Sequence, residues 1–107
     1  MKVAFLLTQD RGGPVDVTVK LAAALRDSGE AEVRVFGPKP ARDAHLVDHE
    51  EISVPRKGDL KASREARAAL RAWRPDVVHA QDRRSGLVCA GLGDIPVVHT
   101  YHGVPDD

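Results

Sequence analysis

Residues 2–29 constrain the fold more than any other stretch, because they combine an apolar run, a glycine turn and a long helical pattern. Residues 2–7 read Lys-Val-Ala-Phe-Leu-Leu, a run typical of a central parallel strand that is buried on both faces. Gly12 and Gly13 follow, and glycines let the backbone turn tightly between a strand and a helix. This order predicts a strand–turn–helix unit at the centre of a parallel sheet.

A helix is predicted over residues 14–28, beginning at Pro14, whose missing N–H would have no partner in the first helical turn. A wide apolar face favours packing on a sheet over packing on one neighbouring helix. That face comprises Val15, Val17, Thr18, Val19, Leu21, Ala22, Ala24 and Leu25, opposite an outward stripe of Asp16, Lys20, Ala23 and Asp27. A helix that begins at a glycine turn aims N–H groups at one point, which favours an anion such as phosphate.

Composition narrows the class of protein. The chain has 107 residues, enough for one domain over residues 1–107, and its formal net charge is zero. This balance gives no signal for nucleic acid. The predicted helix at residues 59–73 has a basic face, which is expected to be a solvated surface, although contact with a membrane surface stays open for it; the face comprises Lys61, Arg64, Arg67, Arg71 and Arg74. No stretch reads as a signal peptide or a membrane span. The single cysteine, Cys89, is compatible with a reducing compartment, so a cytoplasmic protein is expected.

The rest of the chain alternates strand-like and helical segments. Strands are predicted over residues 31–36, 52–55, 77–80 and 97–100, and helices over residues 59–73 and 83–92, with Asp59 and Asp82 as N-caps. Such alternation implies right-handed crossovers and a parallel sheet with helices on both faces. The predicted fold class is α/β, a Rossmann-like doubly wound sheet of about four to five strands.

Ligands in such sheets bind beyond the carboxyl ends of the strands, where the strand order reverses. With the first strand in the centre of the sheet, that point lies beside Gly12 and Gly13. The segments that follow the strands at residues 77–80 and 97–100 end at the same edge. The candidate site residues there are His79, Asp82, Thr100, His102 and Gly103.

Several common sites do not fit. The turn lacks the Gly-x-Gly-x-x-Gly pattern of dinucleotide sites, and the Gly-Lys-Ser/Thr of a Walker loop does not occur. A receiver domain would place paired acids after the first strand, where Asp10 alone stands. His45 and His49 have the spacing of metal ligands but lack a third convergent ligand, so no metal site is predicted.

Three segments, in order, resemble the amino-terminal half of a family-four glycosyltransferase. They are the Gly12–Gly13 turn with its helix, residues 75–80 (Pro-Asp-Val-Val-His-Ala) and residues 96–103 (Pro-Val-Val-His-Thr-Tyr-His-Gly). That family has the GT-B fold, in which two Rossmann-like halves face each other across a cleft. The resemblance implies the acceptor-side half of an enzyme that moves a sugar from a nucleotide-sugar donor to an acceptor hydroxyl. The resemblance implies no essential metal, and it implies no cofactor, since the nucleotide sugar is a substrate.

The resemblance also implies roles for individual residues. Gly12 and Gly13 match the turn that approaches the donor diphosphate. His102 matches a histidine near the donor sugar and the reacting hydroxyl, and it is the predicted catalytic residue. The residues expected on the acceptor side are His79, Asp82, Thr100 and Gly103. Gln81 stands where family members often have a second histidine.

The other half of the GT-B fold is expected to lie outside this sequence, in a missing carboxyl-terminal half or a partner chain. The isolated chain is therefore expected to transfer no sugar. A second class of function stays open, namely a non-catalytic phosphate- or sugar-binding module or one half of a split enzyme. The strand at residues 97–100 has no following helix to cover it, so its edge is expected to be open and to favour self-association or docking on missing sequence.

Overall fold

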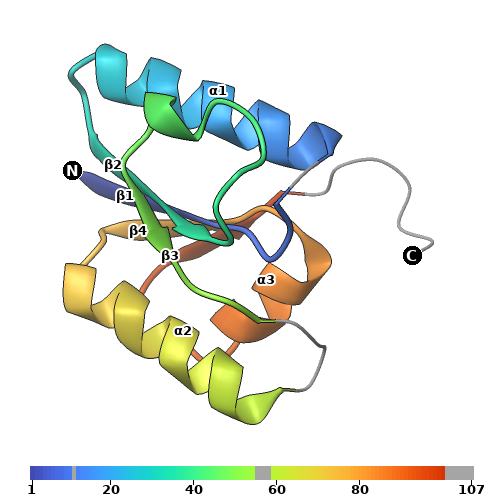
Figure 1. Cartoon of the computed structure of the whole chain (residues 1–107). Helices are drawn as coiled ribbons and strands as arrows, with labels where there is room; N and C mark the ends of the chain where they lie inside the picture. The colour runs from blue at the N-terminus through green and yellow to red at the C-terminus, as the bar shows by residue number, and fades with distance from the viewer. Residues whose placement is uncertain (11, 55–58, 101–107) are drawn as a thin grey trace.

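The computed structural model describes residues 1–10, 12–54 and 59–100 of the chain. Five strands form one parallel sheet in the order β3-β2-β1-β4-β5. The elements are β1 (Lys2–Leu6), α1 (Gly13–Asp27), β2 (Glu32–Gly37), the 3-10 helix η1 (Ala44–Leu46), β3 (His49–Glu51), α2 (Leu60–Trp73), β4 (Val77–Ala80), α3 (Arg83–Cys89) and β5 (Val97–His99). Figure 1 shows α1 on one face of the sheet and α2 and α3 on the other. The predicted α/β fold class and the central position of the first strand are confirmed.

β1 is the central strand because it is apolar from Val3 onward. Val3 to Leu6 are 2% exposed or less, and β2 and β4 pair with β1 on its two sides. Alternate side chains of a strand point to opposite faces, so β1 contributes to two separate cores. Val3 and Phe5 pack with α1, whereas Ala4 and Leu6 pack with α2 and α3.

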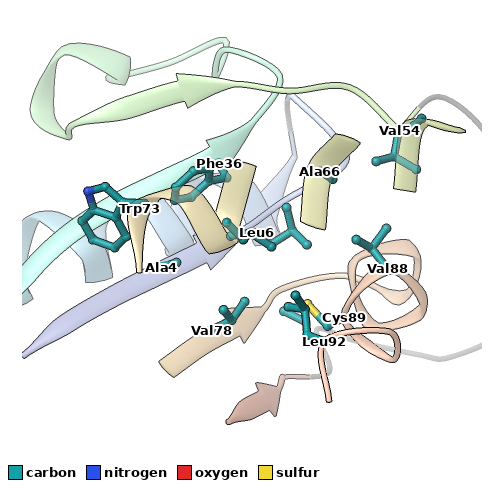
Figure 2. Packing of buried hydrophobic residues seen from close by; sticks show 13 residues of the cluster. Ala4, Leu6, Phe36, Val54, Ala66, Trp73, Val78, Val88, Cys89 and Leu92 are labelled. Carbon is teal, nitrogen blue, oxygen red and sulfur yellow. The ribbon is translucent and has the colours of Figure 1, made fainter. Parts of the chain in front are cut away.

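The larger core lies between the sheet and helices α2 and α3, where Figure 2 shows Leu6, Phe36 and Trp73 gathered together. The rings of Phe36 and Trp73 meet edge-on with their centroids 5.8 Å apart. Lys2 Nζ lies 4.8 Å from the Trp73 ring centroid and donates to the Trp73 carbonyl at 2.7 Å. These contacts fasten the last turn of α2 to the start of β1.

Both predicted N-caps are confirmed. The Asp59 side chain accepts from the N–H of Ala62 at 3.0 Å where α2 begins. The Asp82 side chain accepts from the N–H of Ser85 at 2.8 Å where α3 begins. The helix ends differ slightly from the prediction, since α1 begins at Gly13 and α3 ends at Cys89.

The prediction of a strand at residues 52–55 is wrong. The edge strand is β3, at His49–Glu51, and Arg34 of β2 reaches across to Glu50 at 3.1 Å. β3 consists of polar residues, which an edge strand tolerates because it pairs through its backbone. A prediction based on apolar runs therefore does not detect it. Val54 is 3% exposed and packs into the core on the α2 side without belonging to a strand. Residue 55 lies outside the described residues.

α1 does not bury its whole apolar face. Val15 and Val19 are 1% exposed, but Val17 is 52% exposed and Leu21 is 48% exposed. Ala24 is exposed as well. The prediction that these residues pack on the sheet is therefore wrong for Val17, Leu21 and Ala24, because a flat sheet contacts one side of a helix and not most of its circumference.

The basic side of α2 is partly used inside the fold. Arg67 Nη1 donates to the Val88 carbonyl at 3.3 Å, and Arg71 Nη2 donates to the Gly91 carbonyl at 3.2 Å. These carbonyls lie at and just after the end of α3, where cationic side chains are favourable partners. The two arginines thus join α2 to α3, and this side is not merely a solvated surface.

β5 is open, as expected. Val97 is 38% exposed and Val98 is 46% exposed, and among the described residues β5 pairs with β4 alone. What covers this edge stays a prediction.

Candidate functional site

The turn between β1 and α1 brings Gly12 and Gly13 to the carboxyl edge of the central strand, where both are exposed. Gly12 has a φ of 110°, which residues with a side chain rarely adopt, so the turn itself requires glycine there. Among the described residues, no atom would lie within 4 Å of a Cβ added at Gly13, and the φ of Gly13 lies outside the positive range. Within that part of the chain, neither packing nor backbone conformation therefore requires glycine at position 13.

The first turn of α1 points backbone donors into this open space. The Gly12 carbonyl accepts from the N–H of Asp16 at 3.1 Å, which closes the first helical turn. The N–H groups of Gly13 and Val15 come before this bond and have no acceptor inside the helix, and Pro14 has no N–H. Gly12 has no side chain with which to cap them. The arrangement can bind an anion through backbone N–H groups and the helix dipole.

Asp82 joins the end of β1 to the start of α3. Its Oδ2 accepts from the N–H of Thr8 at 2.8 Å, and its Oδ1 accepts from the Thr8 hydroxyl at 2.9 Å. The same Oδ1 accepts from the N–H of Ser85 at 2.8 Å and lies 2.6 Å from the Ser85 hydroxyl. Three of these contacts involve Oδ1 and one involves Oδ2, so Thr8 and Ser85 engage both oxygens of the carboxylate. Asp82 thus links Thr8, which follows β1, to the first turn of α3.

His79 is half-buried on the same face of the sheet as Phe5, its neighbour across the strand pair. The two ring centroids are 5.0 Å apart. Burial lowers the pKa of His79 below its ordinary value, which favours the neutral imidazole. A neutral imidazole has one donor and one acceptor nitrogen, so it can exchange hydrogen bonds with a hydroxyl group.

Thr18 and Gln81 form a buried polar contact that no pattern in the sequence predicts. Thr18 is 0% exposed, Gln81 is 2% exposed, and the Thr18 hydroxyl donates to Gln81 Oε1 at 3.2 Å. The contact ties α1 to the segment that follows β4. The one available signal was a threonine placed inside the apolar face of a helix. Gln81 is therefore part of the framework that positions α1.

His99 has a structural position at the end of β5. Its Nε2 lies 3.0 Å from the Asp82 carbonyl oxygen. A Cβ added at Gly86 would lie 2.7 Å from the His99 ring, so the ring packs directly on the backbone of α3. This contact fastens β5 to α3.

The N–H of Thr100 donates to the Ala80 carbonyl at 3.0 Å, which keeps Thr100 at the carboxyl edge of the sheet. His102 and Gly103, the other predicted residues after β5, lie outside the described residues. The structure thus places at one edge the predicted site residues Gly12, Gly13, His79, Asp82 and Thr100.

Over residues 1–10, 12–54 and 59–100, no three His, Cys, Asp or Glu side chains gather as metal ligands would. His49 Nε2 instead lies 2.9 Å from the Gly37 carbonyl oxygen. In the same part of the chain, no helix has the length and apolar character needed to cross a bilayer.

Solved structures with the same arrangement include a glycosyltransferase and a protein solved with UDP and glucose. A glycosyltransferase from Rickettsia africae matches 98% of this chain with a TM-score of 0.72 and 14% identity. HepE from Anabaena, solved in complex with UDP and glucose, matches 92% of this chain with a TM-score of 0.68 and 18% identity. The matches cover 31% and 29% of those two proteins, so this chain spans under a third of their length. At these identities the likeness shows the fold alone.

A protein of the universal stress protein family from Burkholderia pseudomallei has a looser likeness, with a TM-score of 0.53 and 10% identity. That match covers 91% of this chain and 94% of the other protein. No curated protein matches the sequence.

The family of this chain is shown by a match that covers most of its sequence. The model of a family described as a glycosyl transferase 4-like domain matches residues 12–107. The match begins at the glycine turn and includes α1, β4 and β5, which are the segments on which the resemblance to family-four glycosyltransferases depends. The chain therefore belongs to the glycosyl transferase 4-like domain family.

Proposed function

We propose that this chain is the acceptor-side half of a glycosyltransferase that moves a sugar from a nucleotide-sugar donor to an acceptor hydroxyl. Family membership supports the reaction class, and the structural likeness to HepE, solved with UDP and glucose, supports the donor class. The single observation that carries the proposal is the start of α1. Neither backbone conformation nor packing against the described residues requires glycine at the exposed position 13, although glycine there costs helix stability.

The proposed chemistry at this point is stabilisation of the leaving group. Sugar transfer expels a nucleoside diphosphate, and its charge must be stabilised as the sugar–oxygen bond breaks. The N–H groups of Gly13 and Val15 supply fixed donors, and the open space at Gly13 lets phosphate oxygens approach the backbone. Gly12 provides the turn that aims these donors.

The acceptor is proposed to bind beside this point. His102 is the proposed catalytic residue, as a hydrogen-bond donor to the donor sugar or a group that orients the acceptor hydroxyl. His79, as a neutral imidazole, and Thr100 and Gly103 are proposed to contact the acceptor. Asp82 is proposed to act at one remove, because Thr8 and Ser85 occupy its carboxylate.

A single half offers few contacts to a donor. A GT-B site lies between two halves, and the Rickettsia africae glycosyltransferase and HepE are each more than three times as long as this chain. Donor affinity of the isolated chain should be weak, on the order of millimolar, because few contacts offset the cost of association. Transfer is proposed to need the second half, on the same chain or on a partner.

A second candidate is a non-catalytic phosphate- or sugar-binding module. The likeness to a universal stress protein supports this candidate, because 94% of that chain is matched and the fold therefore occurs in a chain of about this size. Both candidates bind an anion at Gly13. Only the first predicts sugar transfer by a longer protein that contains this domain.

The anion site is tested by recording the amide signals of Gly12, Gly13 and Val15 during titration with inorganic phosphate and then with UDP-glucose. We expect all three signals to shift in the unmodified chain and to stop responding in Gly13→Val, whose side chain fills the approach. Gly93→Val is the matched control, because Gly93 is also exposed and no atom of the described residues lies within 4 Å of a Cβ added there. If the amide signals do not shift with either ligand at about 10 mM, a concentration well above the expected dissociation constant, the result would count against the proposal.

A further inference from the structure

The outer side of α1 presents a row of exposed residues that we name the α1 stripe. Val17 is 52% exposed and Leu21 is 48% exposed, although both are large and apolar. Ala24 continues the row, as does Ser28, the C-cap residue that follows α1, and both are exposed. The α1 stripe is defined as Val17, Leu21, Ala24 and Ser28.

The stripe is distinct from the sides of α1 that have neighbours. Thr18 and Ala22 are 0% exposed and face the sheet. Arg26 projects from another side and donates to the Leu46 carbonyl in η1. Figure 1 shows that α1 is the only α-helix on its face of the sheet within the described part of the chain. No α-helix of that part therefore lies beside the stripe.

The spacing of the stripe is that of a helix-pairing surface. Its members are separated by four, three and four residues, the alternation by which two helices pack along a seam. Lys20 and Asp27 lie seven residues apart on one flank of the seam, and both are exposed. When two such helices run antiparallel, this flank of one helix faces the same flank of the other. A positive charge followed seven residues later by a negative one is then complementary to itself.

We propose that the α1 stripe binds the α1 stripe of a second copy of this chain, with the two helices antiparallel about a twofold axis. In this register Leu21 packs against Ala24 of the second copy, and Val17 packs against its Ser28. Lys20 then lies beside Asp27 of the second copy, and the symmetry repeats this ion pair. A parallel pairing would place Lys20 beside Leu25 of the second copy and would form no such ion pair.

The surface chemistry fits this pairing. Both contacts that Asp27 makes with Arg26 use Oδ1, at 3.0 Å and 3.2 Å, which leaves Oδ2 for Lys20 of the second copy. The small side chains of Ala24 and Ser28 let the helices approach where Leu21 and Val17 project. The contact is small, so we expect a weak dimer that forms between about 10 µM and about 1 mM. This interface is independent of the proposed sugar transfer.

The test is sedimentation equilibrium of the purified chain over this concentration range, with two charge reversals on the exposed flank. Lys20→Asp and Asp27→Lys each place like charges opposite one another in the proposed register, so each should weaken the dimer about tenfold. Mixing the two variants should restore dimerisation, since every flank contact is then between opposite charges. Leu21→Glu should abolish the dimer, and circular dichroism should show unchanged folding because these residues are exposed.

A strict monomer at about 1 mM would overturn the proposal, and would indicate that another segment or protein covers the stripe. Failure of the mixed variants to associate would overturn the antiparallel register. A dimer disrupted by Val98→Lys but not by Leu21→Glu would place the interface at the β5 edge, and would also overturn it.

Discussion

Replacing Asp82 tests whether one carboxylate holds the strand ends of the site together. Asp82 accepts from Thr8 N–H, the Thr8 hydroxyl and Ser85 N–H at 2.8–2.9 Å. Asp82→Ala removes the N-cap of α3, which costs about 1 kcal/mol. It also leaves the N–H of Thr8, a residue only 9% exposed, without its acceptor, which costs about 1–3 kcal/mol. We expect a total loss of about 2–4 kcal/mol in the free energy of unfolding.

Two variants separate these contributions. Asp59→Ala removes an N-cap that makes one such hydrogen bond, to Ala62, so it should cost only about 1 kcal/mol. Asp82→Ser retains a capping oxygen for Ser85 but is too short to reach Thr8, so it should fall between the two alanine variants. The midpoint of thermal unfolding shifts by about 4–8 °C per kcal/mol for a domain of this size, so the midpoint of Asp82→Ala should lie roughly 10 °C or more below that of the unmodified chain.

The assay is urea denaturation followed by circular dichroism, with the amide signal of Thr8 as a local probe. Equal losses for Asp82→Ala and Asp59→Ala would refute the reasoning, because they would show that the bonds to Thr8 contribute nothing. An Asp82→Ala chain with a protected Thr8 amide would refute it as well.

Three further predictions follow from burial and from the proposed roles. The pKa of His79 lies below 6.5 in the folded chain, so the unfolded chain binds the proton more readily. The free energy of unfolding should therefore decrease as pH falls below 6.5. An NMR titration of the ring that gave a higher pKa would contradict this. Burial raises the pKa of Cys89 from 9.0 to about 12, so the contribution of this thiol to stability is constant below about pH 9 and is lost as pH rises from there toward 12. Alkylation of Cys89 at neutral pH should therefore proceed only as fast as the chain unfolds. Fast labelling of the folded chain would show that this thiol is accessible. In a full-length enzyme, His102→Ala should lower turnover by roughly tenfold to a thousandfold, and unchanged turnover would remove His102 from the site.

The features that the sequence predicts correctly are those decided by local chemistry. The apolar run at the start of the chain can be stable only with strands on both sides, which places β1 in the centre. Asp59 and Asp82 are correct as N-caps because an aspartate before a helical pattern satisfies backbone donors within the same turn. The glycine turn is equally local, since Gly12 needs a positive φ.

The features that the sequence does not predict depend on neighbours distant in the chain. β3 contains no apolar run and is an edge strand whose neighbour Arg34 supplies ion pairs to Asp48 and Glu50. The exposure of Leu21 depends on which elements lie beside α1, and spacing alone does not report that. The Thr18–Gln81 contact joins residues 63 positions apart, so no local pattern pairs them.

The most direct test of the proposed function is transfer of labelled sugar from a panel of nucleotide sugars to a panel of hydroxyl acceptors. It compares a full-length protein that contains this domain, its Gly13→Val and Gly93→Val variants, and the isolated 107-residue chain. We predict transfer by the full-length protein and by Gly93→Val, a large loss in Gly13→Val, and no transfer by the isolated chain. Robust turnover by the isolated chain, or full activity in Gly13→Val, would contradict a cleft site in which the start of α1 holds the leaving diphosphate.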